Sequence, residues 1–183
     1  MRDKKYIEIE ITQEQRDLVN KYAIKQTLNG LSNLDSNDLG KASREQFQIT
    51  GLLGECAWHI LRKNHLNDLI KTLDYKNAEL APNRIGDGGW DDEITFRGTT
   101  RQVDVKTSHS TSEYIDNLNL IVPKREYHQN TIYVLVFTIG KERARPDKTV
   151  LVGWAPNEQV TKIWRPSEPD KLCVPVPELR NLL

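Results

Sequence analysis

An aspartate and a lysine stand two residues apart in a segment whose alternation is typical of a β-strand. Between Arg101 and Ser108, Val103 and Val105 alternate with Asp104 and Lys106. Successive side chains of a strand point to opposite faces of its sheet. We therefore expect the two valines to pack on the core, and the acid and the lysine to lie side by side on the other face. An isolated pair of this kind can also be a surface ion pair. The residues around it therefore decide whether it indicates a functional site.

A second acidic cluster precedes this strand across an expected hairpin. Asp91 and Asp104 would then lie on adjacent strands, where two carboxylates can share a Mg²⁺ ion, which prefers oxygen ligands and keeps several waters. The backbone carbonyl of Val105 can add a ligand. A bound cation lowers the pKa of a water and neutralises charge on a phosphoryl oxygen, and Lys106 can stabilise the charge that develops. This combination forms a workable site for hydrolysis of a phosphodiester by a metal-activated water.

The residue types leave the first metal ligand open between three aspartates. If the strand begins at Asp92, that residue shares a face with Ile94 and Phe96, which is typical of the core. Asp91 then lies on the polar face, so we favour it as the ligand. Asp87 stands in a glycine-rich stretch that indicates a turn.

A helix expected upstream of the hairpin offers another carboxylate. Ser43 and Gln46 have the spacing of a capping box and begin a helix of about 20 residues. Glu55 stands next to its apolar stripe and close to Gly51 and Gly54. Glycine inside a helix costs roughly 1 kcal/mol relative to alanine, so these positions predict a close approach of the helix to the sheet. Glu55 is either a solvated helix residue or a further carboxylate of the site.

Three segments together resemble the motifs of a known nuclease group. They are residues 51–57 (GLLGECA), 86–91 (GDGGWD) and 104–108 (DVKTS). They are similar to those of the PD-(D/E)xK nuclease superfamily, which has the restriction-endonuclease-like fold. The resemblance covers roughly residues 45–140, and Trp90 stands where the superfamily often has proline. It implies a core of one helix, three antiparallel strands, a second helix and a further strand.

The same resemblance implies Mg²⁺-dependent hydrolysis of DNA, with Mn²⁺ able to replace Mg²⁺. Carried onto this chain, it makes Asp91 and Asp104 metal ligands, Lys106 the catalytic lysine and Glu55 an additional carboxylate at the metal. DNA is the implied partner, and a homodimer fits an enzyme that cuts two strands. The alternative is a catalytically inactive nucleic-acid-binding or protein-interaction module on the same fold, because a fold does not fix a function.

Basic residues downstream are candidate contacts for the nucleic-acid backbone. Lys124 follows a short apolar run at 118–122, and Arg143 and Arg145 belong to a basic stretch at 141–148. Phosphate oxygens are contacted chiefly by such side chains. The alternative for residues 141–148 is a solvated hairpin tip.

The remaining pattern predicts an α/β or α+β domain with a central mixed, mainly antiparallel sheet flanked by helices. We expect one nuclease-like domain with its core at about 43–155, a strand–helix extension at 1–42 and an irregular, proline-rich segment at 156–183. Strands are expected at 6–11, 91–97, 101–107, 131–139 and 149–154, a helix capped by Thr12 and Gln15, loops at 28–41 and 81–90, a turn at 98–100, and either helix or strand at 66–73.

Composition limits the classes of function. The 183 residues contain 26 basic and 26 acidic side chains, whereas proteins that coat nucleic acid are usually basic, so charge must act locally. The longest apolar run, 132–137, is far shorter than the roughly 20 residues that span a bilayer. Cys56 and Cys173 lack disulfide or zinc spacing, which favours a reducing cytoplasm.

Overall fold

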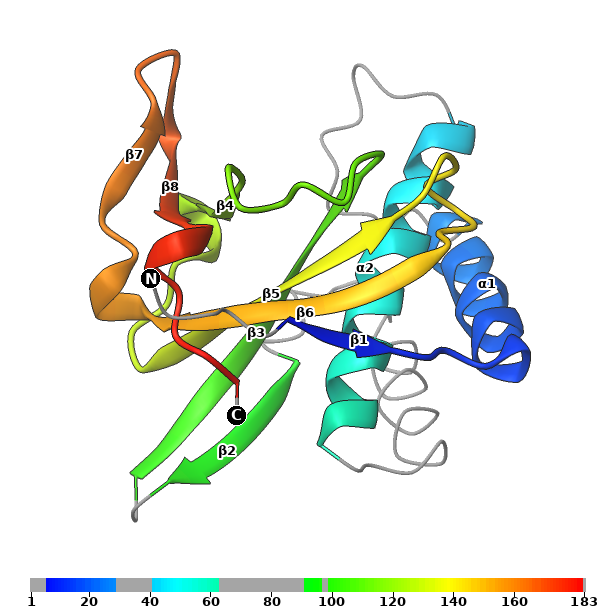
Figure 1. Ribbon diagram of the computed structural model, residues 1–183, viewed down its shortest axis with the longest axis horizontal. Helices are drawn as coiled ribbons and strands as arrows, with labels where there is room; N and C mark the ends of the chain where they lie inside the picture. Colours follow the sequence, from blue (N-terminus) through cyan, green and yellow to red (C-terminus); the bar gives the residue numbers. More distant parts are fainter. Residues whose placement is uncertain (1–5, 29–40, 63–90, 97–98, 183) are drawn as a thin grey trace.

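The computed structural model describes residues 6–28, 41–62, 91–96 and 99–182 (Figure 1). The ambiguous segment at 66–73, the expected turn-rich stretch at 81–90 and Asp87 lie outside the described residues. The described part has two helices, α1 (Gln13–Leu28) and α2 (Lys41–Leu61). Its strands are β1 (Ile7–Ile9), β2 (Asp92–Phe96), β3 (Thr99–Ser110), β4 (Asn119–Pro123), β5 (Thr131–Ile139), β6 (Lys148–Pro156), β7 (Lys162–Arg165) and β8 (Glu168–Pro175), and its 3₁₀ turns are η1 (Lys124–Glu126), η2 (Asn157–Gln159) and η3 (Val176–Glu178).

The strands form two sheets, which confirms a mixed α+β class. The larger sheet has the order β1-β6-β5-β3-β2, and the smaller one has the order β4-β8-β7. All pairings are antiparallel except that of β3 with β5, which run parallel in unbroken register from Gln102↔Thr131 to Ser110↔Ile139. The expected hairpin of β2 and β3 is present, with Asp92 opposite Val103.

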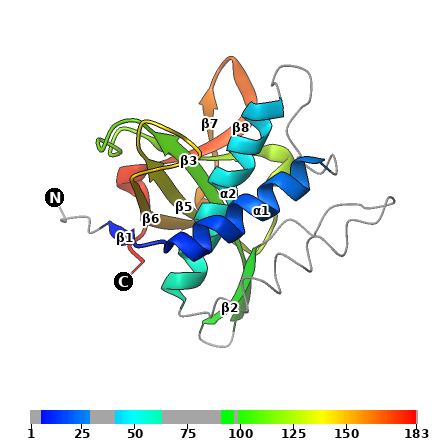
Figure 2. The same ribbon diagram turned by 90° about the vertical axis from the view of Figure 1, so that its right-hand side faces the viewer.

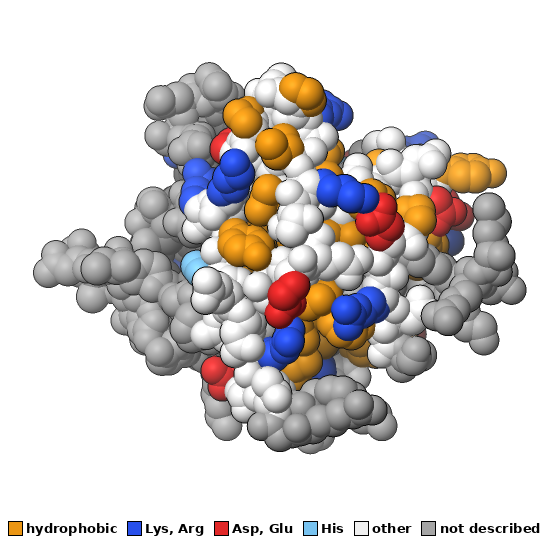
Figure 3. All heavy atoms as spheres, turned by 90° about the vertical axis from the view of Figure 1, so that its left-hand side faces the viewer, with side chains coloured by type: hydrophobic (Ala, Val, Ile, Leu, Met, Phe, Trp, Pro, Cys, Tyr) orange, Lys and Arg blue, Asp and Glu red, His pale blue; other side chains and the backbone are white. Residues whose placement is uncertain are grey.

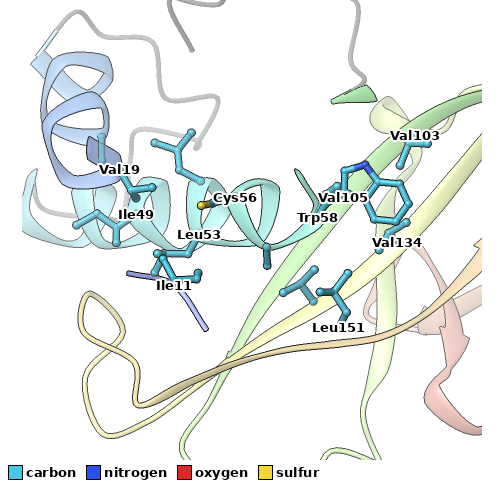
Figure 4. Packing of buried hydrophobic residues seen from close by; sticks show 14 of the residues in the cluster. Ile11, Val19, Ile49, Leu53, Cys56, Trp58, Val103, Val105, Val134 and Leu151 are labelled. Carbon is cyan, nitrogen blue, oxygen red and sulfur yellow. The ribbon is translucent and has the colours of Figure 1, made fainter. Parts of the chain in front are cut away.

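Both helices lie on one face of the larger sheet (Figure 2). Val103 and Val105 of β3 and Val134 of β5 pack there in one cluster with Leu53 and Trp58 of α2 (Figure 4). The other face carries Tyr133, Leu135 and Phe137 of β5 and packs with Leu120 and Val122 of β4 and Val174 of β8. The sheet is therefore covered by helices on one side and by the smaller sheet on the other, and not by helices on both sides among the described residues.

The N-terminal strand and helix are built into the domain. β1 pairs with β6, with Ile7 opposite Leu151, and α1 packs against α2 through the buried side chains of Val19 and Ala23. The capping box of α1 is confirmed, since the backbone N–H of Thr12 donates to Gln15 Oε1 at 2.9 Å and the N–H of Gln15 donates to Thr12 Oγ1 at 3.3 Å. Helix α2 begins at Lys41, two residues before the expected start.

The expectation of an irregular segment after residue 156 is wrong, because β7 and β8 form a hairpin there. The prolines of β8 stand where a missing N–H costs no ladder bond. Pro169 precedes the part of β8 that pairs with β4, and Pro175 ends the strand. Proline density therefore marks the ends of these strands and not the absence of strands.

Helix α2 crosses β3 at a glycine. A Cβ atom at Gly54 would lie 1.8 Å from Oγ1 and 2.9 Å from Cβ of Thr107, so the backbone could not come this close with any other residue. The Thr107 hydroxyl also donates to the carbonyl of Gly51 at 3.5 Å. The expected close approach of helix and sheet is confirmed at Gly54, whereas a Cβ at Gly51 would meet nothing within 4 Å. The contact at Gly54 fixes α2 on the strand that carries Asp104 and Lys106.

Gly54→Ala is expected to lower the free energy of unfolding by about 1–3 kcal/mol, the usual cost of overpacking, despite the higher helix propensity of alanine. Gly51→Ala is the matched control, because nothing lies within 4 Å of its added Cβ. It is expected to be neutral or to stabilise the protein by up to about 1 kcal/mol. Urea unfolding measures both. Equal stability of the two variants would contradict the close contact at Thr107.

No helix within the described residues is long and apolar enough to cross a membrane.

Candidate active site

The β2–β3 hairpin brings the Asp91 carboxylate to the edge of β3. β2 begins at Asp92, which lies opposite Val103. Val105 therefore lies two residues past the N-terminal end of β2, where β2 no longer pairs with β3. The backbone N–H of Val105 donates to Asp91 Oδ2 at 2.7 Å, and the N–H of Asp91 donates to the Val103 carbonyl at 2.7 Å. The N–H and C=O of one strand residue face the same neighbouring strand. The Val105 carbonyl therefore faces the same edge as the Asp91 carboxylate.

Asp104 and Lys106 project together from the face opposite α2, as their alternation with the valines predicts. Lys106 Nζ lies 2.8 Å from Asp104 Oδ2. The pair is not on an exposed surface, because Asp104 is only 4% exposed and the Lys106 side chain 19%. The pair is therefore not a solvated surface ion pair, the alternative that the sequence left open. The smaller sheet and η1 cover this face of β3.

The surroundings of Asp104 disfavour its ionised form. The pKa of Asp104 is raised to about 7, chiefly because the carboxyl is buried. The positive charge of Lys106 lowers this pKa, whereas the negative charges of Asp91 and Glu126 raise it further. The Oδ2 atom of Asp104 lies 2.8 Å from the Lys106 ammonium, the one positive charge among the described groups that shift its pKa. Asp104 is therefore a buried acid close to Asp91 whose charge is incompletely balanced, an environment that favours a bound cation.

Glu126 is a site residue that the sequence analysis missed. Its Oε2 atom accepts a hydrogen bond from Lys106 Nζ at 2.7 Å. Burial opposes the charged form of Lys106, but Asp104 and Glu126 outweigh it and hold the pKa of the lysine above its usual value. Glu126 stands 20 residues beyond Lys106, in a single 3₁₀ turn after β4. Its sequence signal is limited to its place beside Lys124 and Arg125.

Asp92 points away from this group of residues. Its Oδ2 accepts hydrogen bonds from Trp58 Nε1 at 2.8 Å and Arg62 Nε at 3.3 Å, both at the C-terminal end of α2. The strand begins at Asp92, and Ile94 packs against the core on the helix side. Of the two adjacent aspartates, the structure thus places Asp91 beside Asp104 and Asp92 in a contact that joins β2 to α2.

The structure does not bring Glu55 together with the other candidates. Helix α2 covers the face of β3 that carries Val103 and Val105, whereas Asp104 and Lys106 project from the opposite face. Glu55 lies half-buried on α2, across the sheet from them. Its position beside the close contact at Gly54 reflects helix packing. The second carboxylate partner of Lys106 comes from η1.

Of the three expected nucleic-acid contacts, Lys124 lies near the site. It is exposed on η1, two residues before Glu126. Arg143 is half-buried and stacks on Phe47 of α2 at 4.3 Å, and Arg145 is exposed in the same turn between β5 and β6. This turn follows Ile139, which pairs with Ser110, about 13 Å along β3 from Lys106.

Charges of both signs are interleaved with apolar side chains across the described part of the face farthest from the helices (Figure 3). Basic side chains do not gather into one continuous patch on the described part of this face.

The residues present fit a Mg²⁺ ion. Among the described residues there is no group of three or more His, Cys, Asp or Glu side chains arranged to hold a metal. Mg²⁺ needs fewer, since it is usually bound by one or two carboxylates and completes its shell with water and substrate phosphate. Asp91, Asp104 and the Val105 carbonyl supply such a set of oxygen donors at the edge of β3.

Comparison with protein-family models, with curated proteins and with solved structures finds no match to this chain.

Proposed function

We propose that this protein is a Mg²⁺-dependent endonuclease that hydrolyses DNA phosphodiester bonds, with Asp91, Asp104 and the Val105 carbonyl as metal ligands. The proposal rests on the arrangement of side chains at the edge of β3, just past the N-terminal end of β2. There Asp91 binds the backbone of Val105, next to a buried Asp104 in contact with Lys106. Two carboxylates that can bind a cation, and a lysine that can stabilise negative charge, are the groups that phosphodiester hydrolysis needs.

Each residue has a distinct task in this proposal. Mg²⁺ bound at the two aspartates supplies positive charge to the scissile phosphate and lowers the pKa of water. Asp91 and Asp104 hold the cation, and the backbone bond from Val105 fixes the orientation of the Asp91 carboxylate. Lys106 donates hydrogen bonds to the attacking water or to a non-bridging phosphate oxygen, where negative charge grows in the transition state.

The order of elements supports a restriction-endonuclease-like core in part. A helix precedes the hairpin that carries the two acids, and β5 lies parallel to the strand with the lysine. The connection from β3 to β5 differs from what the resemblance implies, because residues 111–130 contain β4 and the one-turn η1 in place of a helix. We propose the nuclease fold with this altered connection, acting on DNA as a dimer in which each copy cuts one strand.

Binding of Mg²⁺ tests the proposal and separates Asp91 from Asp92. Wild type at a Mg²⁺ concentration about 100 times its Kd should gain about 2.7 kcal/mol, or roughly 5–10 °C in Tm, over the protein in EDTA. Asp91→Asn is expected to lose this gain. Asp92→Asn should keep it, while the loss of the charge that pairs with Arg62 lowers Tm equally in Mg²⁺ and EDTA.

Scanning fluorimetry of the three proteins decides between these outcomes. A wild type whose Tm is the same in Mg²⁺, Mn²⁺ and EDTA contradicts the metal site and favours the inactive binding module. A Mg²⁺ shift that disappears in Asp92→Asn and persists in Asp91→Asn shows that the ligand is assigned to the wrong aspartate.

A further inference from the structure

The ammonium group of Lys106 lies between two carboxylates from different parts of the chain. Nζ is 2.8 Å from Asp104 Oδ2 and 2.7 Å from Glu126 Oε2. The contact to Asp104 uses an oxygen of a proposed metal ligand. A cation bound there would compete with the ammonium for that carboxylate and repel it. Glu126 is the acceptor that stays with the lysine when the cation takes Asp104.

Glu126 is held in place from several sides. The hydroxyl of Tyr133 donates to the backbone carbonyl of Glu126 at 3.1 Å and accepts the backbone N–H of His128 at 2.8 Å. Tyr133 is fully buried on β5, directly opposite Asp104 in the sheet register. Arg125 Nε lies 3.5 Å from the other oxygen, Glu126 Oε1. The turn η1 is thus anchored to the same strand pair that carries the acid and the lysine.

We propose that Glu126 is a positioning residue of the nuclease site, which holds the Lys106 ammonium beside the scissile phosphate while Asp104 binds the cation. The inference rests on the proposed function. A lysine side chain is long and has many rotamers, and a flexible donor loses catalytic power when it is misplaced by about 1 Å. The anchored Glu126 carboxylate removes that freedom.

Glu126→Gln tests the proposal, because it keeps the shape of the side chain and removes its charge. We expect kcat for DNA cleavage to fall about 10- to 100-fold, KM for DNA to change less than about twofold, and the Mg²⁺ shift in Tm to persist. Glu126→Asp restores the charge at a shorter reach and should recover part of kcat. The matched control is Glu178→Gln, which breaks a surface pair with Lys162 (2.6 Å) and should leave kcat unchanged.

A second readout does not depend on cleavage. At saturating Mg²⁺, ¹³C relaxation of the Lys106 side chain should report a rigid Cε in wild type and a mobile one in Glu126→Gln, because Asp104, which contacts Nζ at 2.8 Å without the cation, is then occupied by the metal. If wild type cleaves DNA but Glu126→Gln has the same kcat or the same Lys106 mobility, Glu126 does not position the lysine. The proposed nuclease function would still hold in that case. A wild type that cleaves no DNA with Mg²⁺ contradicts the proposed function and this inference with it.

Discussion

Asp104→Asn is expected to reduce Mg²⁺-dependent DNA cleavage by about a thousandfold or more and to abolish the Mg²⁺-induced rise in Tm. Charge stabilisation by a bound metal supplies several kcal/mol, and each 1.4 kcal/mol is a factor of ten in rate. Asp104 is the buried member of the proposed ligand pair, 4% exposed and next to Asp91. The neutral amide cannot replace its charge toward a cation.

The fold should survive this substitution. Burial already favours the neutral form of the Asp104 carboxyl, so an uncharged side chain of the same shape suits the site when no metal is present. Asp170→Asn, at an exposed position of β8, is the control for removal of one acidic charge. Cleavage rates under single-turnover conditions and Tm in EDTA measure the two effects separately. Cleavage by Asp104→Asn at the wild-type rate would remove Asp104 from the mechanism.

Lys106→Met is expected to lower kcat by about 10²–10³-fold, the usual loss when a group that stabilises transition-state charge is removed. Methionine fills a similar volume but cannot donate to a phosphate oxygen. The Mg²⁺ shift in Tm should persist or grow, because the ammonium that contacts Asp104 at 2.8 Å no longer competes with the cation. This separates the lysine from the ligands, whose loss removes cleavage and metal binding together.

Lys162→Met is the matched control for Lys106→Met. Lys162 pairs with Glu178 at 2.6 Å, but its side chain is 57% exposed and it lies on β7 of the smaller sheet. Its loss should leave kcat and the Mg²⁺ shift unchanged. Equal activity of Lys106→Met and wild type would show that Lys106 is only a buried ion-pair partner of Asp104 and Glu126.

Local patterns predicted the parts of the site that lie close together in sequence. The alternation of Val103 and Val105 with Asp104 and Lys106 gave the correct faces, because the period of a strand is two residues. The same argument placed Asp91 on the polar side of a strand that begins at Asp92. Gly54 predicted the close approach of α2, since an interior glycine in a helix needs a structural reason.

Contacts between distant segments left no comparable signal. Glu126 reaches Lys106 because β4 and η1 replace a helix in the connection to β5, and no spacing in the sequence indicates this. Glu55 lies on the helix that the sequence predicted for it. Its distance from Asp104 and Lys106 depends on which face of β3 that helix covers, and the sequence does not indicate this. The hairpin of β7 and β8 was missed because its prolines resemble loop signals until their positions in the pairing register are known.

Cleavage of plasmid DNA tests the central claim most directly. Wild type and Asp104→Asn are incubated with supercoiled and linear DNA in Mg²⁺, in Mn²⁺ and in EDTA, and the products are separated on a gel. Our account predicts nicked or linear products with wild type in either metal, none in EDTA and none with Asp104→Asn. Equal cleavage by the two proteins, cleavage in EDTA, or intact DNA in every lane would contradict it.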